Sequence, residues 1–381
     1  MAMVGLSHGH SPWIFERKDK SDVTLVGIYE PDSALAARYA VRYNLDQNLF
    51  YTNLDQLLDQ TKPEAILAFG SIYDHLAAVQ AAAPRGIHVM MEKPLSAWKS
   101  HADQMKILAE KHQILLLTNF ETSWYPIPKK TYQLIQDSIN FGKIRKTVFH
   151  HGHKGPKEIG VGKEFLDWLA DPSLNGGGAL IDFGCYGANI MTYLMKGQKP
   201  KSVTAITQTF KPNIYPNVDD EATIILDYGD AQAIIQASWN WPFDRKDMEV
   251  YGEKGYVITE DKTSMRVKTW AESQESSFQA ESTELQVYTD PFSYLADVIR
   301  GKIKVEEYSL YSLSNNMIVA EILDAARRSS ATSRRLFSNK RSAFSSLKEN
   351  CSVNLNFVRK ELVFRPLATI NSKTSRQKML I

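Results

Sequence analysis

The first 120 residues alternate short, fully apolar runs with longer segments in which apolar residues recur at helical spacing. The apolar runs cover residues 1–4, 23–29, 65–69, 88–91 and 114–118, and the helical patterns cover residues 33–43, 72–83 and 97–111. Strands that are apolar at every position are buried on both faces, as in a parallel sheet that helices cover on both sides. The alternation therefore predicts a doubly wound α/β domain over residues 1–119.

The pattern changes after Asn119. Helical spacing covers residues 128–141, 178–196, 292–300 and 313–329, and strand-like segments cover residues 203–210, 222–228, 231–239, 247–251 and 256–259. Closely spaced strands separated by Gly and Asp turns are typical of an antiparallel sheet. We expect residues 120–337 to form an α+β domain with a large, mostly antiparallel sheet that has helices on one face.

The end of the chain differs from the rest in charge. From Lys340 onward, nine Lys and Arg residues accompany two Glu residues. These charges stand singly among Ser, Asn and Leu, without the compact basic cluster that contacts nucleic acid or a membrane surface. We expect residues 338–381 to be a basic, poorly ordered tail, and we expect neither a nucleic-acid nor a membrane partner.

Composition excludes several other classes of protein. The 381 residues are 43% hydrophobic and 23% charged, as in globular proteins. Two cysteines, Cys185 and Cys351, are too few for a disulfide-dense scaffold or a Cys-based zinc site. No apolar run reaches the ~20 residues that span a bilayer, and no signal peptide is visible. A cytoplasmic location is the default, but the chain opens directly into a strand, so an exported form with an upstream start stays open.

The first strand-to-helix turn is the expected place for a nucleotide. In it, Gly5 fits the first glycine of the G-x-G-x-x-G fingerprint, whereas Ser7 and His10 occupy the other two glycine positions. His8 and Gly9 lie between them. Ser11 is expected to cap the following helix and Pro12 to be its first residue. A tight turn that binds no ligand explains this segment about equally well.

The second apolar run strengthens the nucleotide interpretation. It ends near Glu30, 25 residues after Gly5, where a carboxylate accepts the adenosine ribose hydroxyls in a Rossmann-type domain. A strand-end acid that caps the next helix is the alternative. The turn and the acid together favour dinucleotide binding, and a carboxylate here repels a 2′-phosphate. We therefore expect NAD as the cofactor rather than NADP.

Two further motifs indicate the chemistry. Glu92-Lys93-Pro94 follows the run at 88–91, and glycines 176–178 precede Asp182-Phe183-Gly184-Cys185-Tyr186. In this order the two motifs resemble the signatures of the glucose–fructose oxidoreductase/inositol dehydrogenase (Gfo/Idh/MocA) family, Glu-Lys-Pro and Gly-Gly-Gly followed by Asp-x-Gly-x-His or Tyr. The order of segments resembles the family from residue 1 to the region of Arg335, and implies its two-domain fold and oxidoreductase activity.

The residues of these motifs suit proton and hydride chemistry. Lys93 lies at the carboxyl end of a buried strand, where α/β sheets bind ligands, and would bind a substrate hydroxyl. Asp182 and Tyr186 are four apart, so on a helix they share one face. Asp182 is expected to pair with Lys93 or orient a sugar hydroxyl. Tyr186 is expected to be the general acid/base, with its pKa lowered by a nearby Lys.

The Tyr at position 186 bears on the branch of the family. Many relatives have His at this position. The Tyr resembles instead the glucose–fructose oxidoreductase and dihydrodiol dehydrogenase branch.

Other positions carry weaker signals. Further expected cofactor contacts are Ser71, His75, Glu92, Lys93 and Asn119, and the expected substrate contacts are His153, Trp168 and Asn189. Trp124, Trp239 and Trp241 are alternatives for stacking on a sugar ring, although core packing explains most aromatic residues. His150, His151 and His153 have the spacing of a strand and loop without an adjacent acid, so we expect no metal.

The combined interpretation is an NAD-dependent oxidoreductase that transfers a hydride between a carbohydrate or polyol carbinol and nicotinamide. Two alternatives stay open, a NAD-dependent glycoside hydrolase of the same fold and a non-catalytic nucleotide-binding regulator. The open antiparallel sheet, together with the resemblance, further predicts a homodimer or homotetramer formed through the C-terminal sheet.

Overall fold

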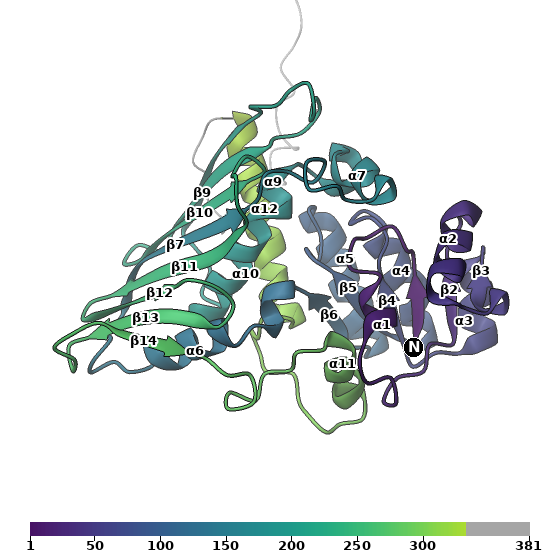
Figure 1. Cartoon of the computed structure of the whole chain (residues 1–381), viewed down its shortest axis with the longest axis horizontal. Helices are drawn as coiled ribbons and strands as arrows, with labels where there is room; N and C mark the ends of the chain where they lie inside the picture. Colours follow the sequence, from purple (N-terminus) through teal and green to yellow (C-terminus); the bar gives the residue numbers. More distant parts are fainter. Residues whose placement is uncertain (333–381) are drawn as a thin grey trace, which may run out of the picture. The chain divides into compact units, whose positions relative to one another are not determined.

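The computed structural model describes residues 1–332, so the predicted basic tail at 338–381 lies outside the described residues. Its first half is built on a six-stranded sheet in which every strand is parallel to its neighbours, in the order β3-β2-β1-β4-β5-β6 (Figure 1). The strands are β1 (Ala2–Val4), β2 (Gly27–Tyr29), β3 (Phe50–Tyr51), β4 (Ala65–Ala68), β5 (His88–Glu92) and β6 (Leu116–Asn119). The predicted doubly wound α/β domain is confirmed.

Helices cover both faces of this sheet because the strand side chains are apolar in both directions. Met3, Leu67 and Met90 face one core, while Val4, Ala68 and Met91 face the other. The helices of this half are α1 (Trp13–Glu16), α2 (Ser33–Tyr43), α3 (Leu54–Thr61), α4 (His75–Ala82) and α5 (Lys99–His112), with 3₁₀ turns at Gln47–Leu49 and Ala83–Arg85. Side chains of α3, α4 and α5 fill one core, and those of α1, α2 and α11 (Pro291–Ile299) fill the other.

The second half is built on an eight-stranded sheet in the order β14-β13-β12-β11-β7-β10-β9-β8. Every neighbouring pair is antiparallel except β7 and β10, so the prediction of a large, mostly antiparallel sheet is confirmed. The strands are β7 (Ile144–Gly152), β8 (Ser202–Gln208), β9 (Glu221–Asp227), β10 (Gln232–Ser238), β11 (Arg245–Gly252), β12 (Gly255–Thr259), β13 (Ser264–Thr269) and β14 (Ser276–Gln279).

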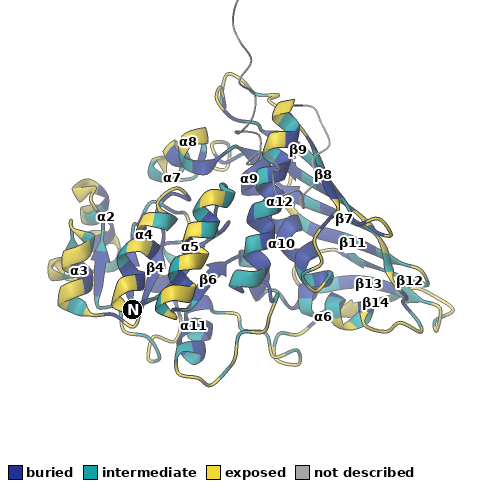
Figure 2. Cartoon of the chain, turned by 180° about the vertical axis from the view of Figure 1, so that it is seen from behind, coloured by how far each residue is buried: buried dark blue, intermediate teal, exposed yellow. Residues whose placement is uncertain are grey.

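Among residues 1–332, helices pack on only one face of this second sheet, where α10 and α12 lie against buried strand residues (Figure 2). The helices of this half are α6 (Pro126–Ile135), α7 (Lys163–Leu169), α8 (Pro172–Asn175), α9 (Ala179–Asp182), α10 (Gly184–Leu194), α11 and α12 (Leu313–Thr332), with a 3₁₀ turn at Glu121–Trp124. Alternation along each strand sends Ile235 into the core and leaves its neighbour Ile234 on the opposite face.

Three helix predictions differ from the structure. The helix predicted over 128–141 ends at Ile135, and the Asp137 carboxylate then accepts the amides of Ile139 and Asn140 in a turn. The single helix predicted over 178–196 is divided at Phe183 into α9 and α10. The helix expected to start at Pro12 is one turn long and starts at Trp13.

The three-glycine motif has a packing reason in the fold. A Cβ on Gly178 would lie 1.8 Å from the backbone oxygen of Asp219. The Asp219 carboxylate also accepts the amides of Gly178 and Leu180, so it satisfies amides at the start of α9. The glycine therefore lets the chain approach β9 closely enough for α9 to begin there.

The predicted division of the chain into two domains can be compared with how the helices pack. The domain boundary at residue 119 stays a prediction, and the structure adds that α11, from the second half, packs against the first sheet.

Within residues 1–332, no helix is both long and apolar enough to cross a bilayer.

The one-sided cover of the second sheet predicts unequal costs for two Ile→Ala substitutions. Ile235 is fully buried between β10 and the helices, whereas Ile107 on α5 is 61% exposed. Ile235→Ala should lower the free energy of unfolding by about 2–5 kcal/mol through the cavity it leaves. Ile107→Ala should change it by less than about 0.5 kcal/mol. Urea unfolding checks both, and equal effects would contradict the assignment of the core face.

Candidate functional site

The expected nucleotide site lies at the carboxyl ends of β1, β2 and β4. Gly5 has a φ of +82°, and a Cβ there would lie 2.8 Å from the amide nitrogen of Gly70, so only glycine lets these two segments approach. Gly5, Glu30, Gly70 and His75 line a cavity of about 260 Å³ with Ser7, Asp74 and several apolar residues. The structure thus brings the predicted cofactor residues of this region together.

Two polar groups in this cavity suit a dinucleotide. His75 is 1% exposed, and its Nδ1 lies 3.2 Å from the carbonyl oxygen of Leu95, so Nδ1 is the donor. Its Nε2 is therefore an acceptor, which is buried and has no hydrogen-bond partner in the described part of the chain. The Glu30 carboxylate accepts the amides of Leu6 at 2.8 Å and Asp32 at 2.9 Å, which fixes it at the end of β2. Burial raises the pKa of Glu30, and these two amides lower it.

The turn after β1 departs from expectation at Ser11. The Ser11 hydroxyl donates to the carbonyl of Leu6 and bonds the Tyr39 hydroxyl, at 2.9 and 2.6 Å, so it does not cap α1. The predicted N-cap is wrong because the turn folds back on itself and buries this side chain. Ser71 is also engaged by the protein, since its hydroxyl donates to Asp74 at 2.6 Å.

Glu92 is the centre of a buried polar network at the end of β5. It is 1% exposed, and its carboxylate lies 3.1 Å from His10 Nδ1 and 3.8 Å from His8 Nε2. Its other oxygen accepts the Asn119 amide at 2.7 Å, and Asn119 in turn accepts the indole N–H of Trp124 at 2.7 Å. Burial raises the pKa of Glu92, but His10, His8 and Asn119 lower it to about 2. Glu92 therefore helps to position the loop after β1 through His8 and His10, and Asn119 holds Glu92 in place. The side-chain contacts of both residues are made within the protein.

The three side chains His8, His10 and Glu92 have ligand atoms within 4.8 Å of one another, the arrangement of a potential metal site. The amide of His10 donates to His8 Nδ1 at 3.1 Å, so Nε2 carries the proton of the neutral ring. Burial lowers the pKa of His8 to about 3, which keeps it neutral. A metal at Nε2 would need that proton removed and the loop hydrogen bond broken. The hydrogen bonding therefore favours an electrostatic contact of the neutral His8 Nε2–H with the Glu92 carboxylate over metal binding.

Lys93 and Asp182 form a buried ion pair between the two halves. Lys93 Nζ donates to Asp182 Oδ1 at 2.5 Å and to the backbone oxygen of Asp182 at 3.0 Å. The other carboxylate oxygen accepts the indole N–H of Trp239 at 2.9 Å, and Trp239 is fully buried. Burial opposes both charges, but the attraction between them raises the pKa of Lys93 and lowers that of Asp182. Trp239 therefore anchors this pair and does not stack on a ligand.

Tyr186 lies between two ammonium groups. Lys93 Nζ is 5.1 Å and Lys246 Nζ 5.2 Å from the centre of its ring. Tyr186 is 2% exposed, and burial, followed by Glu121, raises its pKa well above the ordinary value. The expectation of a lowered pKa is therefore wrong, because burial outweighs the neighbouring lysines. The tyrosine keeps its proton and is suited to donate it.

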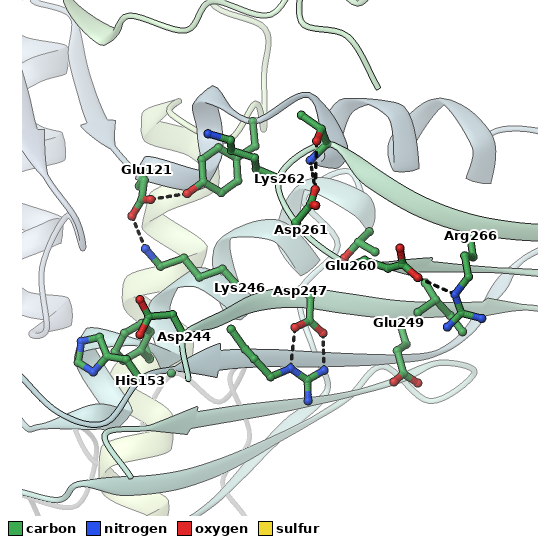
Figure 3. A pocket seen from close by; sticks show the side chains of 17 residues that line it. Glu121, His153, Asp244, Lys246, Asp247, Glu249, Glu260, Asp261, Lys262 and Arg266 are labelled. Carbon is green, nitrogen blue, oxygen red and sulfur yellow. Dashed lines mark hydrogen bonds and ion pairs between the residues drawn. The ribbon is translucent and has the colours of Figure 1, made fainter. Parts of the chain in front are cut away.

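A cleft of about 710 Å³ opens beside this centre (Figure 3). His153 and Phe183 line it next to Asp182 and Tyr186, and charged residues of β11–β13 form its other walls. Lys246 forms an ion pair with Glu121, and Glu121 also accepts a hydrogen bond from the Tyr125 hydroxyl. These three linked side chains all line the cleft. The cleft is large enough for a sugar or polyol, and Phe183 and Lys246, which line it, lie beside the ring of Tyr186.

The three predicted substrate residues lie in different parts of the structure. His153 lines the cleft, and its Nδ1 accepts the amide of Gly155 at 2.9 Å, which leaves Nε2–H as a donor. Trp168 lies against the nucleotide loop, with its ring 5.8 Å from His8. Asn189 lies elsewhere, because its amide donates to Leu310 and Asn316 and joins α10 to α12. Among these three, the structure places only His153 in the cleft.

Comparison with known proteins agrees with this geometry. Residues 1–120 match the NAD-binding Rossmann fold of the Gfo/Idh/MocA oxidoreductases, and residues 130–258 match the C-terminal domain of the same family. The chain belongs to the Gfo/Idh/MocA family. The family binds NAD or NADP, and the Gfo/Idh/MocA fold of two sheets is the one described above.

Several Gfo/Idh/MocA relatives resemble the chain over much of its length. The trans-1,2-dihydrobenzene-1,2-diol dehydrogenase of Xenopus laevis is 24% identical over 80% of this chain and 89% of its own. The D-xylose 1-dehydrogenase [NADP(+)] of Haloarcula marismortui is 26% identical over 49% of this chain and 50% of its own. An inositol dehydrogenase homologue of Azotobacter vinelandii, solved with NAD+, superposes with a TM-score of 0.76 at 16% identity, over 88% and 96% of the two chains.

Two residues near the Gfo/Idh/MocA motifs, Glu121 and Lys246, were missed from the sequence, and a third, His151, was considered only as a metal ligand. Glu121, Lys246 and His151 surround Tyr186, and His151 is 1% exposed with its ring 5.6 Å from the tyrosine ring. Burial and Lys246 lower the pKa of His151 to about 3, so it is neutral. Lys246 carried no local signal because it is one of several charges on β11. Only the pairing of β7 with β11 brings it opposite His151.

The Glu92 network predicts a pH-dependent contribution to stability. Because folding lowers the pKa of Glu92 to about 2, its contribution is complete above the ordinary pKa of 4.5 and is lost as the pH falls. The unfolding free energy of wild type should therefore fall by about 3 kcal/mol more than that of Glu92→Gln between about pH 5 and pH 2. Urea unfolding across this range measures the difference, and parallel curves for the two proteins would contradict it.

Proposed function

We propose that this Gfo/Idh/MocA protein is an NAD-dependent oxidoreductase that transfers a hydride between a sugar or polyol carbinol and nicotinamide. The observation that carries the proposal is the convergence of Lys93, Asp182 and Tyr186, from the two halves of the chain, beside a cleft of about 710 Å³. Relatives named for a diol, for D-xylose and for inositol support a hydroxylated substrate.

The cofactor fits the residues at the end of the parallel sheet. A bound nicotinamide would supply the hydride acceptor or donor. Gly5 lets the ends of β1 and β4 approach each other beside the cavity. Glu30 would accept ribose hydroxyls, and His75 Nε2 offers a buried acceptor that lacks a partner among residues 1–332. The carboxylate of Glu30 disfavours a 2′-phosphate, so the proposal is NAD, although a relative uses NADP(+).

Lys93 and Tyr186 would handle the proton at the substrate oxygen. Both hold protons in the folded protein, since the pKa of each is raised. When a carbonyl is reduced, Tyr186 would donate its proton to the oxygen while the Lys93 ammonium stabilises the negative charge. When a carbinol is oxidised, Tyr186 would first have to release its own proton to solvent, and the tyrosinate would then accept the proton of the carbinol oxygen. Asp182, held by Trp239, would keep Lys93 charged and in place.

The cleft would bind the rest of the substrate. His153 and Lys246 both line the cleft, and the His153 Nε2–H and the Lys246 ammonium are donors for sugar hydroxyl oxygens. Phe183 supplies an apolar surface beside them, which suits the face of a sugar ring. His153 is therefore proposed as a substrate contact.

Activity measurements test the proposal. Wild type should reduce NAD+ with at least one member of a panel of sugars, polyols and vicinal diols, followed at 340 nm. Tyr186→Phe should lower kcat by about 10²–10⁴-fold, because it removes the proton donor. Tyr132→Phe on α6 is the matched control and should leave kcat unchanged.

The outcomes separate the alternatives. Aglycone release from a glycoside without net NADH would favour a glycoside hydrolase. Cofactor binding without turnover, and with no effect of Lys93→Met in any assay, would favour a regulator.

We further propose a homodimer or homotetramer through the uncovered face of the second sheet. Ile225, Ile234 and Val148 pair in register across β9, β10 and β7. Glu249 of β11 follows Val148 in this register, and both Glu249 and its partner Ile258 on β12 line the cleft, so the apolar row is limited to the first three residues. They alternate with core residues and lie outside the helix-covered core. A second copy of the same face would bury this apolar row, as in isologous interfaces.

Light scattering tests the assembly. Wild type should have at least twice the protomer mass, and Ile234→Glu should shift the equilibrium to the monomer by placing a charge in the interface. Ile107→Glu, on the exposed side of α5, is the control and should leave the mass unchanged. A monomeric wild type would contradict the proposal.

A further inference from the structure

A second cavity adjoins the substrate cleft. It has a volume of about 580 Å³ and lies between the two halves of the chain, since its lining comes from α1 and the segment after it, the 3₁₀ turn at Glu121–Trp124, the turn between β12 and β13, and the start of α11. The cleft beside the reacting centre has a volume of about 710 Å³. Each cavity alone has the size of a complete small-molecule site, about 300–1,000 Å³. Together they offer room for more than one ring.

The two cavities share one wall. Glu121, Tyr125, Lys262 and Thr263 line both of them, and Figure 3 shows Glu121 and Lys262 at the edge of the cleft. The Tyr125 hydroxyl donates to Glu121, and the Asp261 carboxylate accepts the amide of Thr263 at 2.7 Å. Hydrogen bonds therefore hold both parts of this wall in place, and the cavities meet along it.

The shared wall lies next to the reacting centre. Lys246 pairs with Glu121 of the wall, and its Nζ lies 5.2 Å from the centre of the Tyr186 ring. The side chain of Lys246 thus links the wall to the proposed proton donor. A sugar that reacts at Tyr186 would lie beside the wall, and a group attached to that sugar would extend into the second cavity.

Aromatic side chains distinguish the second cavity from the cleft. The His10 ring covers one face of Trp13, with centroids 3.9 Å apart, and Trp13 is nevertheless only half-buried, as is Tyr125. The surface that these two rings retain is flat and apolar, and such a surface suits the face of another ring. The aromatic residues that line the cavity are Trp13, Trp124, Tyr125 and Phe292.

Most of the charge in the second cavity is neutralised within the protein. Arg17 donates to Asp290 at 2.6 Å, and Glu121 pairs with Lys246. The other charged residues that line it are two carboxylates and two ammonium groups, Glu16, Asp19, Lys18 and Lys262. This balance gives no preference for an ionic ligand, so the aromatic surface determines what the cavity binds.

We propose that the second cavity is a subsite for an uncharged second ring of the substrate, which is then a disaccharide or an aryl glycoside rather than a free sugar. The proposal rests on the proposed function, since it extends the substrate of the same site. The reacting sugar would lie in the cleft beside Tyr186, and the second ring would cross the wall at Tyr125 and lie against Trp13. A ring with an apolar face is the chemistry that both compounds share.

Steady-state kinetics of the full-length protein with NAD+ test the proposal. Each sugar of a panel is supplied as the free sugar, as a reducing disaccharide and as its phenyl glycoside, so that oxidation at C1 and at other carbons is covered. For the preferred sugar, kcat/KM with a two-ring compound should exceed that with the free sugar by about 10-fold, the effect of one additional buried ring contact. A preference for the disaccharide would identify the second ring as a sugar, and a preference for the phenyl glycoside would identify it as an aryl group.

A substitution at Thr289 tests the position of the subsite. Thr289 is exposed and lines the second cavity but not the cleft. Thr289→Trp should fill part of the cavity and lower kcat/KM for the two-ring compound about 10-fold relative to that for the free sugar. Thr283→Trp is the matched control, because Thr283 is exposed in the same segment and lines neither cavity, and it should leave this ratio unchanged.

The outcomes distinguish this proposal from the proposed function. No redox turnover with any compound would overturn both. Turnover of free sugars at a kcat/KM equal to or above that of the two-ring compounds would overturn only the second subsite. A Thr289→Trp protein in which both values fall by the same factor would also overturn it, since the substitution would then act on the fold or on the cleft.

Discussion

The buried ion pair between Lys93 and Asp182 is the interaction on which the site depends. It joins the end of β5 in the parallel sheet to the end of α9 on the second sheet. Two charges at 7% and 8% side-chain exposure are tolerable only because each also has hydrogen bonds, from Lys93 to the Asp182 carbonyl and from Trp239 to the carboxylate. This geometry fixes the ammonium beside the ring of Tyr186.

A second buried carboxylate organises the cofactor side of the same strand. Glu92 and Lys93 are adjacent, yet Glu92 points to the loop after β1 and Lys93 to α9. Successive residues of a strand point in opposite directions, so one strand end supports both the cofactor loop and the proton-handling residues. The pairing of β5 with β6 places Glu92 opposite Asn119, and Lys93 follows directly after the strand.

Much of the fold was predictable because its signals are local. Fully apolar runs predicted the parallel strands, since a strand covered on both faces has no polar side. Strand-like segments closely spaced between Gly and Asp turns predicted β9 and β10. The short β3 and α3 went unpredicted because two strand residues and eight helical residues give little periodicity. The division of one long helix at Phe183 also left no clear sequence signal.

The sequence by itself determined the motif residues, the two-sheet architecture and the family, because these depend on residue type, spacing and hydrophobic pattern. Only the tertiary structure decided what those residues do to one another. In the folded chain the indole N–H of Trp239 donates to Asp182, and the ammonium of Lys246 lies near the ring of Tyr186. Asn189 forms a hydrogen bond that joins α10 to α12. It also reversed the expected pKa shift of Tyr186, since burial and charge at a point depend on residues that are distant in the chain and meet only after folding.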